Sequence, residues 1–70
     1  MGRVKIFVNG VEMEVPTETN VSGLLEILQE SYSPEMIVEI NHRFIHAREY
    51  DNTILKEGDR LEIIHLAMGG

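Results

Sequence analysis

Apolar and polar residues alternate along the first part of the chain, with one interruption. Residues 3–8 alternate, residues 11–15 alternate again, and Asn9-Gly10 separates the two runs. Asn-Gly favours a two-residue turn whose twist matches that of the flanking strands, so the pattern predicts a β-hairpin. A loop of this length fixes the register. The predicted cross-strand pairs are Val8 with Val11, Ile6 with Met13, Val4 with Val15, and Lys5 with Glu14.

A helical period follows the hairpin after a loop at residues 16–19. Asn20 is a suitable N-cap, because its side chain can accept a hydrogen bond from a backbone N–H of the first turn. The residue before a proline is pushed away from helical geometry, so the helix is expected to end near Tyr32, ahead of Ser33-Pro34. Its apolar stripe at i, i+3, i+4 and i+7 consists of Val21, Leu24, Leu25 and Leu28.

Three further strands are predicted in the second half of the chain. Residues 36–40 form an apolar run with β-branched side chains, and Phe44-Ile45 is expected to be a short edge strand. Ile54 and Leu55 are expected beneath the loop that follows them. After a turn at residues 56–59, the last strand is predicted at 60–66. It has apolar side chains on both faces, Leu61 and Ile63 on one and Ile64 and Leu66 on the other, which is typical of a central strand.

This order of elements predicts an α+β fold of the β-grasp type. A right-handed crossover through the helix lets the last strand pair in parallel with the first. The expected architecture is a mixed sheet of four to five strands with one helix packed on one face. We expect residues 1–66 to form this domain and residues 67–70 to form a flexible C-terminal tail that ends in Gly-Gly.

Composition and charge restrict the function. The chain has 70 residues, which is enough for one domain, and it contains no cysteine, which excludes a disulfide or a persulfide on this chain. Its formal charge of −6 disfavours nucleic acid as a partner and favours docking on a basic protein surface. The residues after Met1 resemble neither a signal peptide nor a membrane span, so a cytoplasmic protein with no membrane partner is expected.

No catalytic or metal-binding constellation is evident in the sequence. An activated nucleophile needs a neighbouring base, and no such spacing is present. The histidines at 42, 46 and 65 fall on different elements and lack the i, i+4 spacing of a helical metal site. We therefore expect no catalytic residue, no metal and no bound cofactor.

The last residues are the strongest candidate for a site. Gly69 and Gly70 follow the final strand and have no turn to form, and Ala67 and Met68 connect them to that strand. A tail without Cβ atoms can enter a narrow channel and bring its terminal carboxylate to a phosphate. Such a carboxylate reacts only after conversion to an acyl adenylate, so the chemistry requires ATP and a second protein. The chain would then be a substrate and co-substrate of partner enzymes rather than an enzyme.

An apolar patch is expected beside the base of the tail. If the first and last strands are neighbours, Phe7, Ile64 and Leu66 lie on the face of the sheet opposite the helix. We interpret this patch as a docking surface for a partner protein.

The sequence resembles the ThiS family of sulfur carriers over nearly its whole length. The matching segments are Val21-Ser22-Gly23-Leu24-Leu25, Ile40-Asn41, the run from Leu55 through Gly58-Asp59 to Ile63, and Gly69-Gly70. The resemblance implies that Gly70 is adenylated by a ThiF-like enzyme and thiocarboxylated with sulfur from a donor protein. It also implies that a ThiG-like thiazole synthase uses this sulfur in thiamine biosynthesis.

Two departures from the family pattern leave other branches open. The family often has Val-Pro-Arg where this chain has Ile45-His46-Ala47-Arg48, and often a third glycine where it has Met68. A MoaD-like carrier for molybdopterin synthesis is the second interpretation. A ubiquitin-like modifier and a non-catalytic β-grasp binding module are the others.

Overall fold

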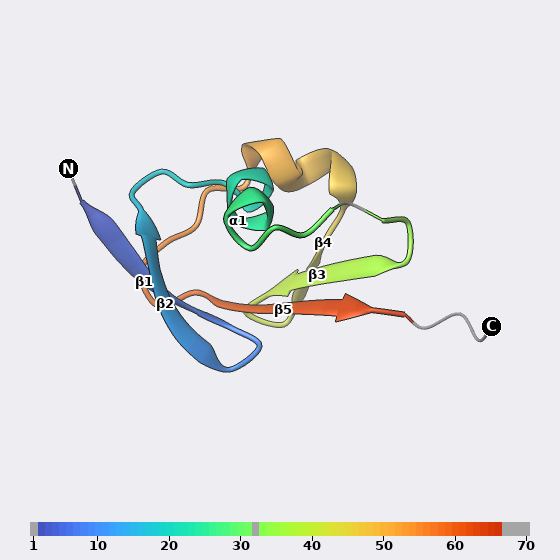
Figure 1. Cartoon of the computed structure of the whole chain (residues 1–70), viewed down its shortest axis with the longest axis horizontal. Coiled ribbons are helices and arrows are strands. Elements are labelled where there is room, and N and C mark those ends of the chain that lie inside the picture. The colour runs from blue at the N-terminus through green and yellow to red at the C-terminus, as the bar shows by residue number, and fades with distance from the viewer. Residues whose placement is uncertain (1, 32, 67–70) are drawn as a thin grey trace.

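The computed structural model of the protein describes residues 2–31 and 33–66 and shows a five-stranded mixed sheet with one α-helix (Figure 1). The strand order is β2-β1-β5-β3-β4, so the last strand is central and the two edge strands are β2 and β4. This confirms the expected β-grasp architecture. In chain order the elements are β1 Arg3–Val8, β2 Val11–Pro16, α1 Val21–Ile27, β3 Met36–Ile40, β4 Arg43–Ile45, the 3-10 helix η1 Ala47–Asn52, and β5 Arg60–His65.

The β1–β2 hairpin has the predicted register, including the pairs Val8 with Val11 and Ile6 with Met13. Asn9 and Gly10 both have positive φ values, 50° and 85°, as the two-residue turn requires. One member of the apolar face departs from expectation, because Val11 is 66% exposed at the tip of the hairpin.

Helix α1 begins as predicted and ends earlier. The Asn20 side chain accepts a hydrogen bond of 2.7 Å from the Gly23 N–H, which confirms its N-cap role. The helix ends at Ile27 rather than near Tyr32, because Gln29 adopts a left-handed conformation with φ 59°. The Glu30 and Gln29 N–H groups donate to the Leu25 and Glu26 carbonyls at 2.8 and 3.0 Å, which is a Schellman C-cap.

The segment between β3 and β5 is more ordered than the sequence indicated. Strand β4 contains the predicted Phe44-Ile45 edge strand, while η1 was not predicted. The prediction for Leu55 is confirmed, at 2% exposure, and that for Ile54 is wrong, because its side chain is 44% exposed. Strand β5 ends one residue before the expected Leu66.

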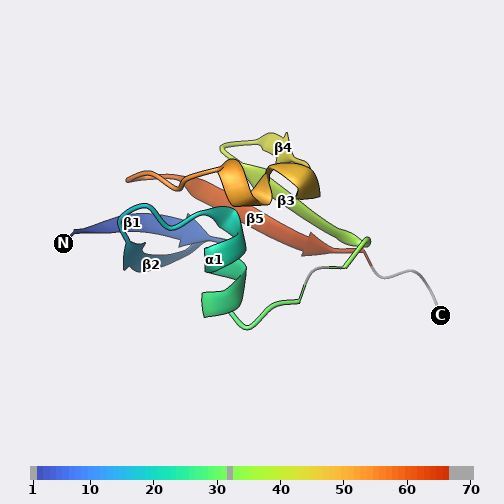
Figure 2. The same cartoon turned by 90° about the horizontal axis from the view of Figure 1, so that it is seen from above.

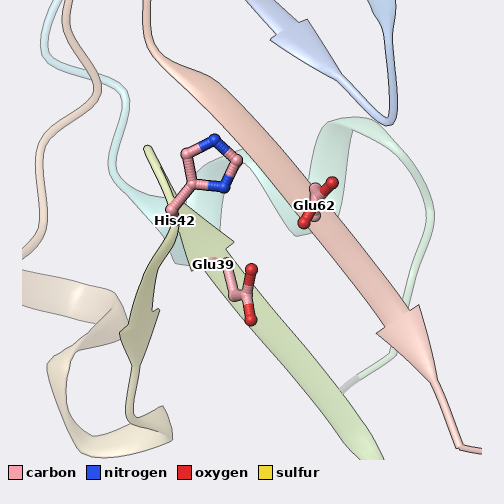
Figure 3. Close-up of side chains that lie close together, drawn as sticks. All are labelled: Glu39, His42 and Glu62. Atoms are coloured by element: carbon pink, nitrogen blue, oxygen red, sulfur yellow. The ribbon is translucent and has the colours of Figure 1, made fainter.

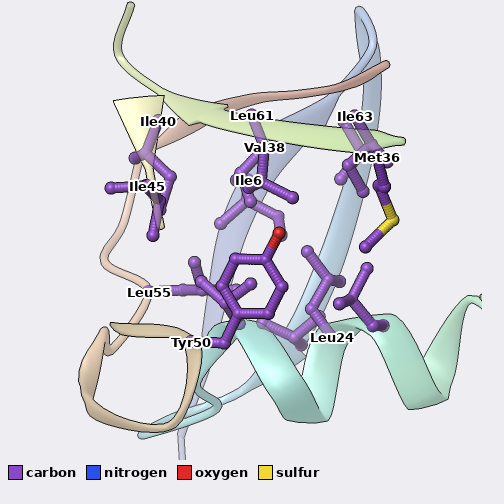
Figure 4. Close-up of a cluster of buried hydrophobic side chains, with 14 residues drawn as sticks. Ile6, Leu24, Met36, Val38, Ile40, Ile45, Tyr50, Leu55, Leu61 and Ile63 are labelled. Carbon is purple, nitrogen blue, oxygen red and sulfur yellow. The ribbon is translucent and has the colours of Figure 1, made fainter. Parts of the chain in front are cut away.

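The hydrophobic core lies between the sheet on one side and α1 with η1 on the other (Figure 4). Each strand contributes inward-facing apolar side chains, and none of the described polar or charged residues is buried. Because β5 is the middle strand, its inward-facing Leu61 and Ile63 are buried, and the core fixes the path of this strand across the molecule (Figure 2). The buried residues are Ile6, Val8, Val15, Val21, Leu24, Leu25, Met36, Val38, Ile40, Ile45, Tyr50, Leu55, Leu61 and Ile63.

Candidate functional site

Strand β5 delivers the chain to the candidate site, and its two neighbours support it unequally. Strand β3 pairs with it in antiparallel fashion along five residue pairs, from Ile40 with Leu61 to Met36 with His65. Strand β1 pairs with it in parallel only at its start, where Phe7 faces Arg60. The second half of β5 therefore has a regular strand ladder on the β3 side alone.

Asn9 extends the β1 side of this ladder with its side chain. Its backbone N–H donates to the Leu61 carbonyl at 2.9 Å. Its side-chain amide then pairs with both backbone groups of Ile63: Oδ1 accepts from the Ile63 N–H at 2.9 Å and Nδ2 donates to the Ile63 carbonyl at 3.3 Å. One residue thus forms the hairpin turn and holds the last strand. From the sequence, only the turn role of Asn9 was predicted.

The start of β5 is fixed by a second set of hydrogen bonds, one between backbone groups and three that involve side chains. Gly58 has φ 85° and its N–H donates to the Lys5 carbonyl at 2.7 Å. The Asp59 carboxylate accepts hydrogen bonds from the Lys56 N–H at 2.8 Å and from Asn41 Nδ2 at 3.1 Å. Asn41 Oδ1 in turn accepts from the Arg60 N–H at 3.0 Å. The Gly58-Asp59 turn and the Asn41 turn therefore form one hydrogen-bonded unit.

Residues at and just past the end of β5 make two contacts with other segments. The Leu66 N–H donates to the Glu35 carbonyl at 3.0 Å, which continues the β3 ladder one residue past the strand. His65 Nε2 lies 3.1 Å from Glu30 Oε1, so the strand end contacts the segment that follows α1. Both side chains of that pair are about half exposed, so the contact contributes little to stability.

The structure separates the three residues of the expected docking patch. Ile64 follows the buried Ile63 on β5, and Leu66 lies two residues further, one residue past the strand. The pleat places both on the sheet face opposite α1, where they are 40% and 46% exposed. Ile37 on β3 is paired with Ile64 on β5, and the sequence did not indicate that it belongs to this surface. Phe7 lies level with Arg60, whose guanidinium carbon is 4.8 Å from the ring centroid. Ile64 is four residues further along, roughly 13 Å away.

The expected tail residues, Ala67, Met68, Gly69 and Gly70, lie outside the described residues. The structure therefore defines the base from which they start. Three apolar side chains, Ile37, Ile64 and Leu66, are grouped there, and we refer to them as the tail-base patch. Among the described residues, no helix has both the length and the apolar character needed to cross a bilayer.

A five-stranded mixed sheet with the last strand in the middle, and one α-helix across a single face, defines a β-grasp domain. The sequence model of the ThiS family matches residues 2–70, and the chain belongs to the ThiS family.

Two solved structures are similar to this chain. The crystal structure of the thiamine biosynthesis protein (ThiS) from Geobacter metallireducens is 29% identical, with a TM-score of 0.81, over 96% of this chain and 100% of that one. The solution NMR structure of a thiamine biosynthesis protein from Geobacter metallireducens is also 29% identical, with a TM-score of 0.76, over 96% and 88%. A search of curated proteins found no match.

Proposed function

We propose that this protein is a sulfur carrier for thiamine biosynthesis and that the carboxylate of Gly70 carries the sulfur. The observation that carries the proposal is the family match, which extends through the Gly69-Gly70 end. The two similar structures are named thiamine biosynthesis proteins, which supports the pathway. The central position of β5 also supports the proposal, because the strand that precedes the candidate tail is anchored in the middle of the sheet.

The proposed chemistry takes place in the active sites of partner enzymes. In a ThiF-like enzyme, a carboxylate oxygen of Gly70 attacks the α-phosphorus of ATP, pyrophosphate leaves, and an acyl adenylate forms. Sulfur at the sulfide oxidation level, supplied by a donor protein, then attacks the carbonyl carbon. The bond to AMP breaks and a thiocarboxylate remains. A ThiG-like thiazole synthase is the proposed acceptor of this sulfur.

The length of the tail determines how close the partner must dock. The proposed sulfur-carrying residue, Gly70, is four residues past Leu66, and a fully extended chain of that length reaches at most about 14 Å. The activating site must therefore bind the surface around the tail base itself. Gly69 and Gly70 suit this approach, because a backbone without Cβ atoms fits a narrower channel than any other.

The tail-base patch is the surface we propose for docking. Ile64 and Leu66 are apolar and exposed, and acidic side chains such as Glu35 and Glu62 lie nearby in the register of β3 and β5. An apolar centre with an acidic surround complements a partner surface that has an apolar centre and basic residues around it. Phe7 was expected in the same surface, and its distance along the sheet makes it a separate point of contact.

A set of altered chain ends tests the carrier role. The chain that ends at Gly70 is compared with one lacking Gly70 and with one extended by a single alanine, each incubated with the activating enzyme and ATP. We expect pyrophosphate release with the first chain and none with the other two. A binding module would associate with its partner equally well in all three forms. Equal pyrophosphate release from the extended chain, with no trimming, would contradict the proposal.

Charge substitutions on the sheet face opposite α1 test the docking surface. We expect Ile64→Asp and Leu66→Asp to weaken binding to the activating enzyme at least tenfold, because each places a carboxylate in an apolar contact. Phe44→Asp is the matched control, since Phe44 is 48% exposed on edge strand β4, away from the tail base. The affinity of Phe7→Asp for the same enzyme tests whether Phe7 is a separate point of contact. Unchanged affinity in folded Ile64→Asp and Leu66→Asp proteins would refute this surface.

A further inference from the structure

Three ligand-type side chains converge on the sheet face opposite α1. Glu39 comes from β3, Glu62 from β5, and His42 from the turn between β3 and β4 (Figure 3). One nitrogen or oxygen atom from each lies within 4.8 Å of the other two. From the sequence, only the three histidines were considered together as metal ligands, and the described histidines do not form such a group with one another.

The two carboxylates are held side by side by the sheet. Glu39 and Glu62 are directly opposite in the β3–β5 register, a position in which like charges destabilise a sheet. Within residues 2–31 and 33–66, the Lys and Arg ion pairs are Arg3–Glu14 and Lys5–Glu12, so neither carboxylate has a basic partner. Arg60 is two residues from Glu62, but its guanidinium stacks on the Phe7 ring.

The third ligand, His42, lies in a turn whose backbone is left-handed. Asn41 and His42 have φ values of 53° and 69°, which glycine and asparagine adopt most readily. His42 also lines a surface hollow of about 220 Å³ together with Glu62, Phe7, Gly10, Arg60 and Leu61. His42 and Glu62 therefore both border this hollow, whereas Glu39 does not line it.

We propose that Glu39, His42 and Glu62 bind one divalent transition-metal ion, with Zn²⁺ as the preferred metal. One imidazole nitrogen and two carboxylate oxygens form a ligand set that Zn²⁺ accepts, whereas Mg²⁺ and Ca²⁺ favour oxygen alone. Three protein ligands leave a fourth position for water in the hollow. Metal–ligand bonds of 2.0–2.2 Å place tetrahedral ligand atoms about 3.4 Å apart. The ligand atoms lie within 4.8 Å of one another, and rotation of the exposed His42 and Glu62 side chains brings them to the shorter spacing of a metal site.

Titration of the chain of residues 1–70 with ZnCl₂ in a calorimeter tests the site. We expect one ion per chain, and affinity at least tenfold lower in Glu39→Gln, His42→Asn and Glu62→Gln. Asparagine keeps the left-handed turn, so the His42 variant preserves the fold. His46→Asn and His65→Asn are matched controls, because each of these histidines also lies near a glutamate, Glu49 or Glu30, and both should bind Zn²⁺ like the original chain.

A thermal measurement separates ligand loss from misfolding. Without metal, Glu62→Gln should melt higher than the original chain, because it removes the like-charge pair. With Zn²⁺, the original chain should gain melting temperature and Glu62→Gln should gain none. Full affinity in His42→Asn, loss of binding in His46→Asn or His65→Asn instead, or no binding below millimolar Zn²⁺ would each overturn the proposal.

Discussion

Replacing Asn9 with glycine is the sharpest test of how the last strand is held. The variant removes the side-chain amide that pairs with both backbone groups of Ile63. Glycine adopts the φ of 50° found at this turn position without strain, so the hairpin keeps its geometry. The loss is therefore confined to two hydrogen bonds between the turn and β5.

The expected cost follows from those two bonds. Each contributes about 0.5–1.5 kcal/mol net, and partial exposure of the site lets water replace some of the lost interaction. We expect the free energy of unfolding to fall by about 1–2 kcal/mol. For a domain of this size, each kcal/mol shifts the melting temperature by roughly 4–8 °C.

Urea unfolding followed by circular dichroism measures this change, and amide hydrogen exchange locates it. The Ile63 amide should lose protection in Asn9→Gly, whereas amides on β2 should keep theirs. Glu18→Gly is the matched control, because Glu18 also has a positive φ, 72°, and its side chain makes no described hydrogen bond. If Asn9→Gly were as stable as Glu18→Gly with an unchanged Ile63 exchange rate, the side-chain ladder would be refuted.

Three further substitutions test other parts of the scaffold. Gln29→Gly should raise the free energy of unfolding by about 1 kcal/mol, because Gln29 follows the C-cap of α1 with a φ of 59°, and a lower free energy of unfolding in urea would contradict the Schellman assignment. Leu61→Ala should lower it by about 2–5 kcal/mol, because the side chain is 1% exposed, and a loss near zero would contradict its core position. Asp59→Ala should cost about 1–2 kcal/mol through the lost hydrogen bonds to Lys56 and Asn41, and an unchanged melting temperature would argue against that unit.

The elements that the sequence predicted well are those in which several local signals agree. In the hairpin, the alternation and the Asn9-Gly10 turn give the same register, and the structure has it. The central place of β5 follows from its two apolar faces, with Leu61 and Ile63 inside and Ile64 outside. These patterns are local and periodic, so they can be read without knowing the fold.

The features that the sequence did not predict depend on contacts between distant residues or on unusual backbone angles. Helix η1 is joined to α1 by Asn20, whose Nδ2 donates to the Asp51 carbonyl at 3.1 Å, and by the Ser22–Asp51 hydrogen bond. The early end of α1 depends on Gln29 in a conformation more typical of glycine.

Contacts between distant residues also explain why the sequence did not predict the arrangement of the candidate site. The parallel register of β1 and β5 sets Phe7 opposite Arg60 and so apart from Ile64, and no local pattern encodes that register. The antiparallel register of β3 and β5 brings Glu39 beside Glu62. Both depend on how the sheet assembles around the core.

Fragmentation mass spectrometry of the intact protein tests the central claim most directly. The chain is incubated with the activating enzyme, ATP and a sulfide donor, and then fragmented to locate any mass change. The account predicts exchange of one oxygen for one sulfur in the fragment that contains Gly70, and no exchange in a chain that lacks this residue. Sulfur located at an internal residue, or incorporated equally well without Gly70, would contradict it.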